Sequence, residues 1–189
     1  MRIARFHLYP EYCGIFEVYG SAEAEAELIS YELTDSAFID YFQLCRPDLV
    51  YLFVIGDRTG NTYFDIRLDE PVPAAKDVVH TAQMPFLVKG DQVSPEGEKG
   101  IIIGYEEYRS VDIPPGNYLL TVHQCFGKYP LGYPENASEE DKKSWPCLPT
   151  RMRMWFNRVD NLDEQVAESR WHHFYKRNKD EYLKNKNDG

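Results

Sequence analysis

Short runs in which apolar and polar residues alternate recur along the chain, and turn residues separate them. Phe64, Ile66 and Leu68 alternate with charged residues, and residues 78–88 form a further extended stretch. Alternation with a period of two predicts half-buried β-strands. Residues 49–55 are instead an unbroken apolar run rich in Val, Tyr and Phe, which predicts a central buried strand. Several strands with turn signals between them predict a mainly-β fold, an antiparallel β-sandwich.

The clearest local signal is the turn sequence at residues 114–117, Pro-Pro-Gly-Asn. The second proline presets φ for a turn, and Gly116 can adopt the positive φ that a type II turn requires. β-Branched and aromatic residues, which favour extended backbone, lie on both sides. The pattern therefore predicts strands at residues 111–113 and 118–122, joined by a tight turn.

One or two peripheral helices are expected beside the strands. Thr34 or Asp35 can accept hydrogen bonds from the first amides of a helix, and apolar residues at positions 37, 38, 41 and 42 share one helical face. Pro47 would end this helix. Residues 21–27 alternate Ala and Glu without an apolar stripe, which favours a solvated helical turn or a loop.

The length of 189 residues predicts one main domain. Residues 1–160 are expected to form the sandwich, with an irregular insertion at 126–149 that is rich in Pro and Gly. After it, Met152, Met154 and Phe156 alternate with polar residues and predict a closing strand with its arginines facing outward. Residues 161–189 are polar with scattered aromatic residues, and we expect a helical or partly disordered tail.

The charge is negative and unevenly distributed. The formal net charge is −10, and residues 1–100 hold 17 of the 31 acidic residues but only 8 of the 21 basic ones. An acidic surface repels nucleic acid and membranes and steers a basic protein partner toward it. Acidity that serves only solubility is the alternative.

The cellular compartment is predicted from two features of the sequence, its targeting signals and the spacing of its cysteines. No apolar run approaches the roughly 20 residues of a membrane-spanning helix, and the amino terminus lacks an apolar signal segment. The cysteines at positions 13, 45, 125 and 147 contain no CxxC pair, which favours reduced, buried thiols over a disulfide or zinc framework. These features predict a soluble cytoplasmic protein.

Catalytic and metal-binding patterns are weak. His172 and His173 are adjacent, so their side chains diverge and do not form a chelate, and no metal or cofactor is expected. A hydrolase that uses Cys125 with His7 or His80 is kept as a minor hypothesis, although a buried thiol is usually inert. The chain has no phosphate-binding glycine loop and no GxSxG sequence, so we do not expect an enzyme.

Four short motifs follow one another in a familiar order. They are Thr34-Asp35-x-Ala37, Arg46-Pro47 before a strand at residues 50–53, Pro85-Phe86-x-Val88, and Val111-x-Ile113-Pro114-x-Gly116-x-Tyr118-x-Leu120. This order resembles that of the bacterial competence-protein-J-like proteins, which inhibit a partner DNA-entry nuclease. Related domains resemble immunity proteins paired with nuclease toxins. The resemblance covers about residues 6–124, and residues 126–149 and the tail beyond Val159 have no counterpart in it.

The resemblance implies a non-enzymatic β-sandwich that neutralises a nuclease or toxin, and an acidic surface suits that role. Nuclease clefts are basic because they neutralise phosphates, so an inhibitor can occupy one with carboxylates on a rigid element. For each candidate an ordinary solvated position is the alternative. A small-molecule or glycan-binding sandwich is the alternative function. The candidate partner-binding carboxylates are Asp57, Asp65, Asp69 and Glu70 on a predicted hairpin, and Glu106, Glu107 and Asp112 beside the Pro-Pro-Gly turn, with Tyr63, Tyr105 and Tyr108 as aromatic anchors or core residues.

Overall fold

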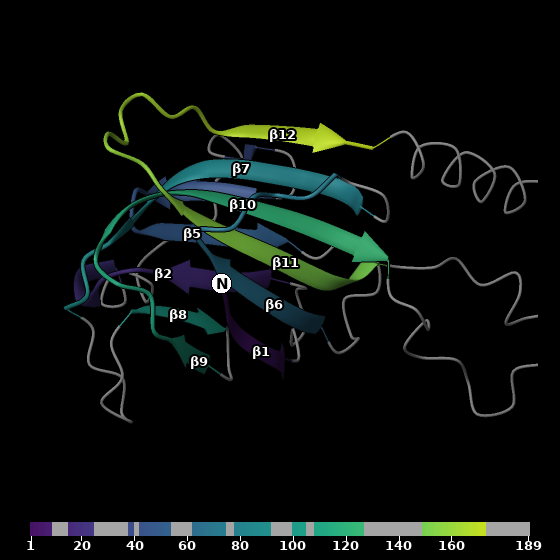
Figure 1. Ribbon diagram of the computed structural model, residues 1–189, viewed down its shortest axis with the longest axis horizontal. Coiled ribbons are helices and arrows are strands. Elements are labelled where there is room, and N and C mark those ends of the chain that lie inside the picture. The colour runs from purple at the N-terminus through teal and green to yellow at the C-terminus, as the bar shows by residue number, and fades with distance from the viewer. Residues whose placement is uncertain are drawn as a thin grey trace, which may run out of the picture.

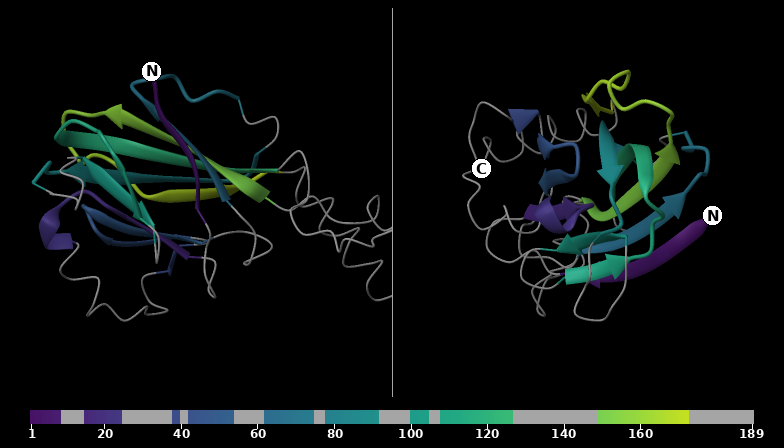
Figure 2. Two further views of the ribbon diagram at one scale, coloured as in Figure 1. Left: turned by 90° about the horizontal axis from the view of Figure 1, so that it is seen from below. Right: turned by 90° about the vertical axis from the view of Figure 1, so that its left-hand side faces the viewer.

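The strands form two six-stranded sheets that face each other as a β-sandwich, which confirms the mainly-β prediction (Figure 1, Figure 2). The computed structural model describes residues 1–8, 15–24, 38–39, 42–53, 62–74, 78–91, 100–104, 108–126 and 149–172. Helix within these ranges is confined to one turn at residues 22–24. In the part of the chain so described, no helix is long and apolar enough to cross a membrane.

The first sheet, which we call sheet A, is mixed. The pair β6–β11 is parallel and every other neighbouring pair is antiparallel. β11 lies between two other strands, so it is a central strand and not the predicted closing strand. In spatial order sheet A comprises β1 (Arg2–Leu8), β6 (Thr62–Leu68), β11 (Pro149–Arg158), β10 (Gly116–Phe126), β7 (Val78–Val88) and β12 (Glu168–Trp171).

The second sheet, sheet B, is antiparallel throughout. The apolar run after residue 48 forms β5, which has neighbours on both sides, as predicted. In spatial order sheet B comprises β3 (Phe38–Ile39), β4 (Phe42–Arg46), β5 (Leu49–Phe53), β2 (Ile15–Tyr19), β8 (Ile101–Gly104) and β9 (Tyr108–Val111).

Alternate residues of both sheets meet in the core between them. Met152, Met154 and Phe156 of β11 are at most 1% exposed, which confirms the inward-facing set predicted for this strand. The ring of Phe16 in sheet B packs edge to face on Phe64 in sheet A, with 4.9 Å between the ring centroids. Burial of an apolar side chain of this size contributes about 1.5–3 kcal/mol, so each such contact between the sheets stabilises the sandwich.

Residues 114–116 carry the chain from one sheet to the other. β9 pairs in sheet B and β10 pairs in sheet A, so the strands on either side of this segment do not pair with each other. Gly116 has a φ of 157° and begins β10, whereas the predicted type II turn needs a φ of about +80°. The hydroxyl of Tyr118 donates a hydrogen bond to the carbonyl oxygen of Pro114 at 2.7 Å and fixes the crossing. β5 and β6 also lie in different sheets and do not form the predicted hairpin.

Two predicted helices are wrong where they fall within the described residues. Residues 42–46 form β4, and Phe42 is buried in the core. Pairing of β4 with β5 outweighs the helical spacing of the apolar residues, because propensity is a weak prior against tertiary contacts. Residues 168–171 form β12, where a helical or partly disordered tail was expected. Residues 34–37, 127–148 and 173–189 lie outside the described ranges.

A buried ionic cluster joins the two sheets at one end. The Asp48 carboxylate, in the turn between β4 and β5, accepts hydrogen bonds from Ser21 Oγ at 2.6 Å and Arg46 Nε at 2.9 Å. Lys89, which follows β7 of sheet A, places its Nζ 3.2 Å from the same carboxylate. Burial disfavours this charge, but the hydrogen bonds from Ser21 and Lys89 and the charge of Arg46 outweigh burial and lower the pKa of Asp48.

Candidate functional site

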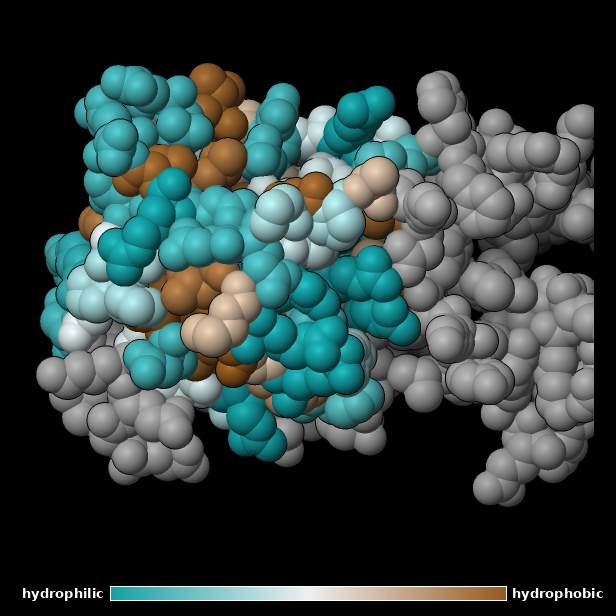
Figure 3. All heavy atoms as spheres, viewed as in Figure 1, coloured by the Kyte–Doolittle hydropathy of each residue, from teal (hydrophilic) through white to brown (hydrophobic). Residues whose placement is uncertain are grey.

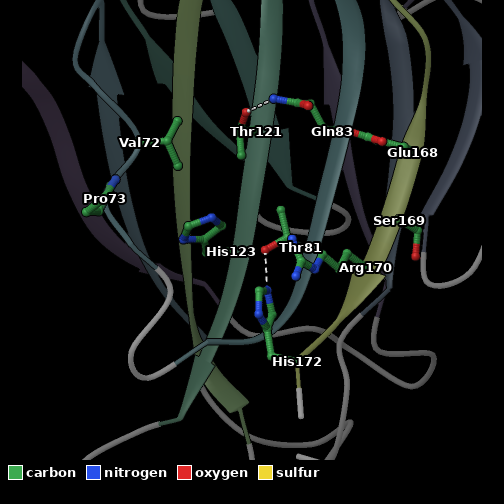
Figure 4. A pocket seen from close by; sticks show the side chains of 10 residues that line it. All are labelled: Val72, Pro73, Thr81, Gln83, Thr121, His123, Glu168, Ser169, Arg170 and His172. Atoms are coloured by element: carbon green, nitrogen blue, oxygen red, sulfur yellow. Dashed lines mark hydrogen bonds between the residues drawn. The ribbon is translucent and has the colours of Figure 1, made fainter. Parts of the chain in front are cut away.

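An open groove of about 300 Å³ lies on the face of sheet A that points away from the core (Figure 4). β7 and β10 form its floor, β12 forms one wall, and Val72 and Pro73 form the other. Eight of its ten lining residues are polar or charged, and none is Phe, Tyr or Trp. Among the described residues, the groove therefore offers no Phe, Tyr or Trp ring for the stacking that the glycan-binding alternative needs.

The β12 wall carries opposite charges two residues apart. Arg170 is opposite Thr81 of β7, and Glu168 is opposite Gln83, so both charged side chains are on the groove side of the sheet. Both are exposed. Nε2 of His172 lies 2.8 Å from Thr81 Oγ1, which places an imidazole at the same end as the guanidinium (Figure 4).

Sequence reasoning missed this wall because residues 161–189 were expected to be a tail. A signal was present, since residues 168–171 read Glu-Ser-Arg-Trp and alternate charged residues with a small or aromatic one. That alternation is typical of a strand at a sheet edge. The contact between β12 and β7 includes a 2.8 Å hydrogen bond between His80 Nε2 and Ser169 Oγ.

The floor of the groove is held by side-chain contacts. Gln83 Nε2 donates to Thr121 Oγ1 at 3.0 Å, which joins β7 to β10. The ring of His123 packs against Trp155 of β11, with 4.7 Å between ring centroids. These contacts orient the side chains on which a ligand would rest.

The groove is one end of a row of polar side chains that crosses all six strands of sheet A. The register aligns one residue from each strand, and three of the six are arginines. In order from β1 to β12 the row comprises Arg5, Asp65, Arg153, His123, Thr81 and Arg170.

Asp65, a predicted partner-binding residue, is buried beneath arginines of its own chain. Its carboxylate lies 3.0 Å from Arg2 Nε, 3.4 Å from Arg67 Nε and 3.6 Å from Arg5 Nη2. Burial disfavours the charge, but hydrogen bonds from Arg2 and Arg67 outweigh burial and lower the pKa of Asp65. Glu70 is engaged in the same cluster, because Arg67 Nη1 donates to it at 2.6 Å.

Among the described residues, the outer face of sheet A carries more arginines than carboxylates. Arg5 and Arg151 approach the ring of Tyr63, at 5.4 and 5.8 Å from its centroid. Hydrophilic side chains gather over β6 and β11 on the face seen in Figure 3. Among the described residues the arginines of this face are Arg2, Arg5, Arg67, Arg151, Arg153 and Arg170, and the carboxylates are Asp65, Glu70 and Glu168.

The other predicted carboxylates do not join this cluster. The Asp69 side chain is 49% exposed. Its carboxylate accepts a hydrogen bond from the backbone amide of Arg158 and lies 3.9 Å from Arg158 Nε. Asp112 is exposed at the crossing between the sheets. Asp57, Glu106 and Glu107, together with Tyr105, lie outside the described residues.

A further carboxyl group on sheet B was not anticipated. Glu17 is only 7% exposed on the outer face of sheet B, opposite Gly104. Tyr108, 42% exposed, donates its hydroxyl hydrogen bond to Glu17 at 3.3 Å. Burial raises the pKa of Glu17 to about 7, against a smaller lowering effect of the Tyr108 hydrogen bond.

The residues of the hydrolase hypothesis each make a structural contact. Cys125 is fully buried, with its Sγ 3.7 Å from the carbonyl oxygen of His123. His80 contacts Ser169 beneath β12, and the His7 ring packs on Tyr63 at the opposite edge of sheet A. In the described ranges no three His, Cys, Asp or Glu side chains converge as a metal site.

In sequence comparisons no family model and no curated protein matches the chain. The structure is similar to the crystal structure of ComJ from Bacillus subtilis, described as an inhibitor of the DNA degrading activity of NucA. The TM-score is 0.56 and the sequence identity 17%, and the match covers 84% of this chain and 98% of ComJ. The resemblance predicted from the order of the motifs is thus confirmed at the level of the fold, over more of the chain than residues 6–124.

Proposed function

We propose that this protein is a non-enzymatic inhibitor that acts in the bacterial cytoplasm by binding and neutralising a nuclease or a nuclease toxin. One observation carries the proposal: the fold matches almost the whole length of ComJ, whose described role is inhibition of the nuclease NucA. The structural contacts of Cys125, His7 and His80 fit a binding protein better than a hydrolase.

The partner is proposed to be basic and to contact carboxylates outside the arginine cluster. The described residues hold 12 of the 31 acidic side chains and 10 of the 21 basic ones, so most of the negative excess belongs to the remaining segments. Asp57, Glu106 and Glu107 are in those segments, and Asp69 and Asp112 are exposed. Asp65 and Glu70 are assigned a structural role, because the chain's own arginines already neutralise them.

The first experiment is capture from native lysate with the purified protein as bait, followed by mass spectrometry and a DNA-degradation assay of the captured protein. We expect a nuclease whose activity falls to background at a one-to-one ratio of inhibitor to nuclease. Capture of no specific protein, or of a nuclease whose activity is unchanged by saturating bait, would contradict the proposed function.

The partner surface is tested by reversing three carboxylates, in the variant Glu106→Lys, Glu107→Lys and Asp112→Lys. Steering by charge predicts slower association with the nuclease, at least tenfold weaker binding and a flatter dependence on salt. The matched control, Asp160→Lys, Asp163→Lys and Glu164→Lys, changes the net charge equally at residues in the loop before β12. Equal losses in the two variants would show that only total charge matters.

A further inference from the structure

We propose that Glu17, on the outer face of sheet B, is a docking site for an arginine side chain of a basic protein partner, with the exposed Tyr108 ring as its cover. This deepens the proposed function and rests on it, because it assigns one contact of the proposed basic partner. The site is on the β9 side of sheet B, and the exposed Asp112 follows that strand.

A row across sheet B brings Glu17 and Tyr108 together. β2, β8 and β9 are neighbours in that order (Figure 1), and the register puts Gly104 opposite both Glu17 and Tyr108. Phe16 and Val18 point into the core, so Glu17 points away from it. Neighbouring strands are about 4.8 Å apart, and the Tyr108 hydroxyl nevertheless reaches a carboxyl group two strands away. Gly104 has no side chain, which leaves the space between them for the Tyr108 ring.

Glu17 is buried without a positive charge to neutralise it. Its hydrogen bond from the Tyr108 hydroxyl is 3.3 Å long, which is long for a bond between two oxygens. Among the described residues no ion pair involves Glu17, and burial raises its pKa to about 7. The titratable groups that face it are tyrosines, which are neutral near pH 7: Tyr51 from β5, Tyr108 from β9 and Tyr19 along β2, while β8 contributes Gly104. A cation from outside the chain would therefore supply the partner that this buried charge lacks.

A second polar group without a partner lies in the same row. Gln43 of β4 is opposite Tyr51, which is opposite Glu17, so Gln43 is on the same face. It is fully buried, and neither its Nε2 nor its Oε1 has a hydrogen-bond partner among the described residues. The row thus holds two acceptors that need donors, a carboxyl group and an amide oxygen. A guanidinium offers five N–H donors in a plane and matches a carboxylate bidentately, whereas an ammonium offers three from one point, so arginine fits better than lysine.

Tyr108 lies between the site and the surface. Its side chain is 42% exposed on β9, an edge strand of sheet B, and its ring packs edge to face on Tyr19 with 6.2 Å between centroids. Exposed side chains change rotamer within nanoseconds, so Glu17 can be uncovered without unpairing a central strand. An exposed tyrosine beside a desolvated charge is typical of an interface hot spot, and a tyrosine ring also attracts a guanidinium.

Docking is linked to the proton on Glu17. Arginine pairs with the ionised carboxylate, which forms as the pH rises through about 7. A guanidinium nearby favours that charge, so binding should release a proton and lower the pKa of Glu17. Affinity should consequently be about tenfold higher at pH 8 than at pH 6. An exposed carboxylate with an ordinary pKa is ionised at both values and would show no such change.

The test is an NMR titration of the intact protein with the tripeptide acetyl-Gly-Arg-Gly-amide. The matched ligand carries citrulline in place of arginine, which keeps the shape and removes the charge. At pH 8 we expect saturable shifts of the backbone amides of residues 17, 104 and 108, with a dissociation constant below about 10 mM and at least about fivefold weaker binding of the citrulline peptide. Saturating arginine peptide should also move the titration midpoint of the Glu17 carboxyl carbon below 7.

The variant Glu17→Gln keeps the size of the side chain and removes the carboxylate. It should fold at least as stably as the wild type at pH 8, so a loss of binding would not reflect unfolding. We expect it to bind the arginine peptide about tenfold more weakly and without pH dependence. Glu168→Gln, which removes an exposed carboxylate from sheet A, is the matched control and should bind like the wild type.

Four outcomes would overturn the proposal. They are no saturable shift up to about 50 mM peptide, equal binding of the citrulline peptide, equal affinity at pH 6 and pH 8, or an equal loss in Glu168→Gln. Failure of the proposed inhibition is distinguishable from these results, because the peptide titration needs no nuclease. A captured nuclease that the wild type and Glu17→Gln inhibit equally would overturn this site and leave the inhibition standing.

Discussion

Glu17 is a buried carboxyl group whose ionisation acts against folding. Its pKa is raised from 4.5 to about 7, so its contribution to stability is complete below pH 4.5 and is lost as the pH rises through 7. This loss is worth up to about 3 kcal/mol. We expect Glu17→Gln to unfold at higher urea concentration than the wild type at about pH 8 and at a similar concentration near pH 4.5.

A matched exposed carboxylate separates this effect from a general change in charge. Glu168→Gln also removes one negative charge, but from the exposed wall of the groove, and should not raise the urea midpoint at pH 8 as Glu17→Gln does. The titration midpoint of Glu17, followed by carbon NMR of its carboxyl group, should lie near 7. A midpoint near 4.5 would contradict the assignment.

At the scale of the elements, the end of β2 meets the end of β7 with no space for a side chain. The amide of Lys89 donates to the carbonyl oxygen of Gly20 at 2.8 Å, and a Cβ added at Gly20 would collide with the carbonyl oxygen of Leu87. We expect Gly20→Ala to destabilise the protein by about 1–3 kcal/mol, through overpacking that the backbone must absorb. Urea unfolding measures the change, and Ala22→Ser at an exposed position nearby is the control. Equal urea midpoints for the two variants would show that the backbone where β2 meets β7 accommodates the added methyl group without loss of stability.

The individual strands could be predicted from the sequence, but their pairing could not. Alternation identified β11 and its buried Met152, Met154 and Phe156, because burial on one face imposes a period of two. A turn signal is local, so the segment at residues 114–116 gave no indication that it joins different sheets. Phe42 fitted a helical face equally well, and its pairing with β5 decided the outcome.

The same limit applies to the candidate site. Asp65 was expected on the solvent-exposed face of its strand. The neighbouring sequence does not reveal that Arg5 lies opposite Asp65, or that Arg2, 63 residues away, donates a hydrogen bond to it. The groove depends on β12 and β7, which are distant in sequence, and its described lining residues form no catalytic or metal-binding motif in the sequence. The sequence therefore offered Asp65 as a candidate, but neither the arginines that surround it nor the residues that line the groove could be predicted from it.

At the scale of the whole molecule, two buried carboxylates act on stability in the opposite direction to Glu17. Burial disfavours the charges of Asp48 and Asp65, but their hydrogen bonds outweigh burial and lower both pKa values from 3.8. A lowered pKa stabilises the folded state above the unfolded value of 3.8, and this stability is lost as the pH falls through the folded value. The Asp48 cluster joins the two sheets, so its protonation should loosen the sandwich as a unit.

Stability should consequently be greatest between about pH 4 and 5, because the Glu17 contribution declines as the pH rises from 4.5 to about 7, while Asp48 and Asp65 remain ionised at pH 4 to 5. The net charge strengthens this trend, because repulsion within a protein of charge −10 falls as the pH approaches the isoelectric point near 5.0. Thermal unfolding across a pH series measures the profile. Asp48→Asn should lower the midpoint at neutral pH and flatten the acid limb, whereas Glu17→Gln should flatten only the decline toward alkaline pH. A wild-type midpoint that rises steadily to about pH 8 would show that ionisation of Glu17 does not control stability on the alkaline side.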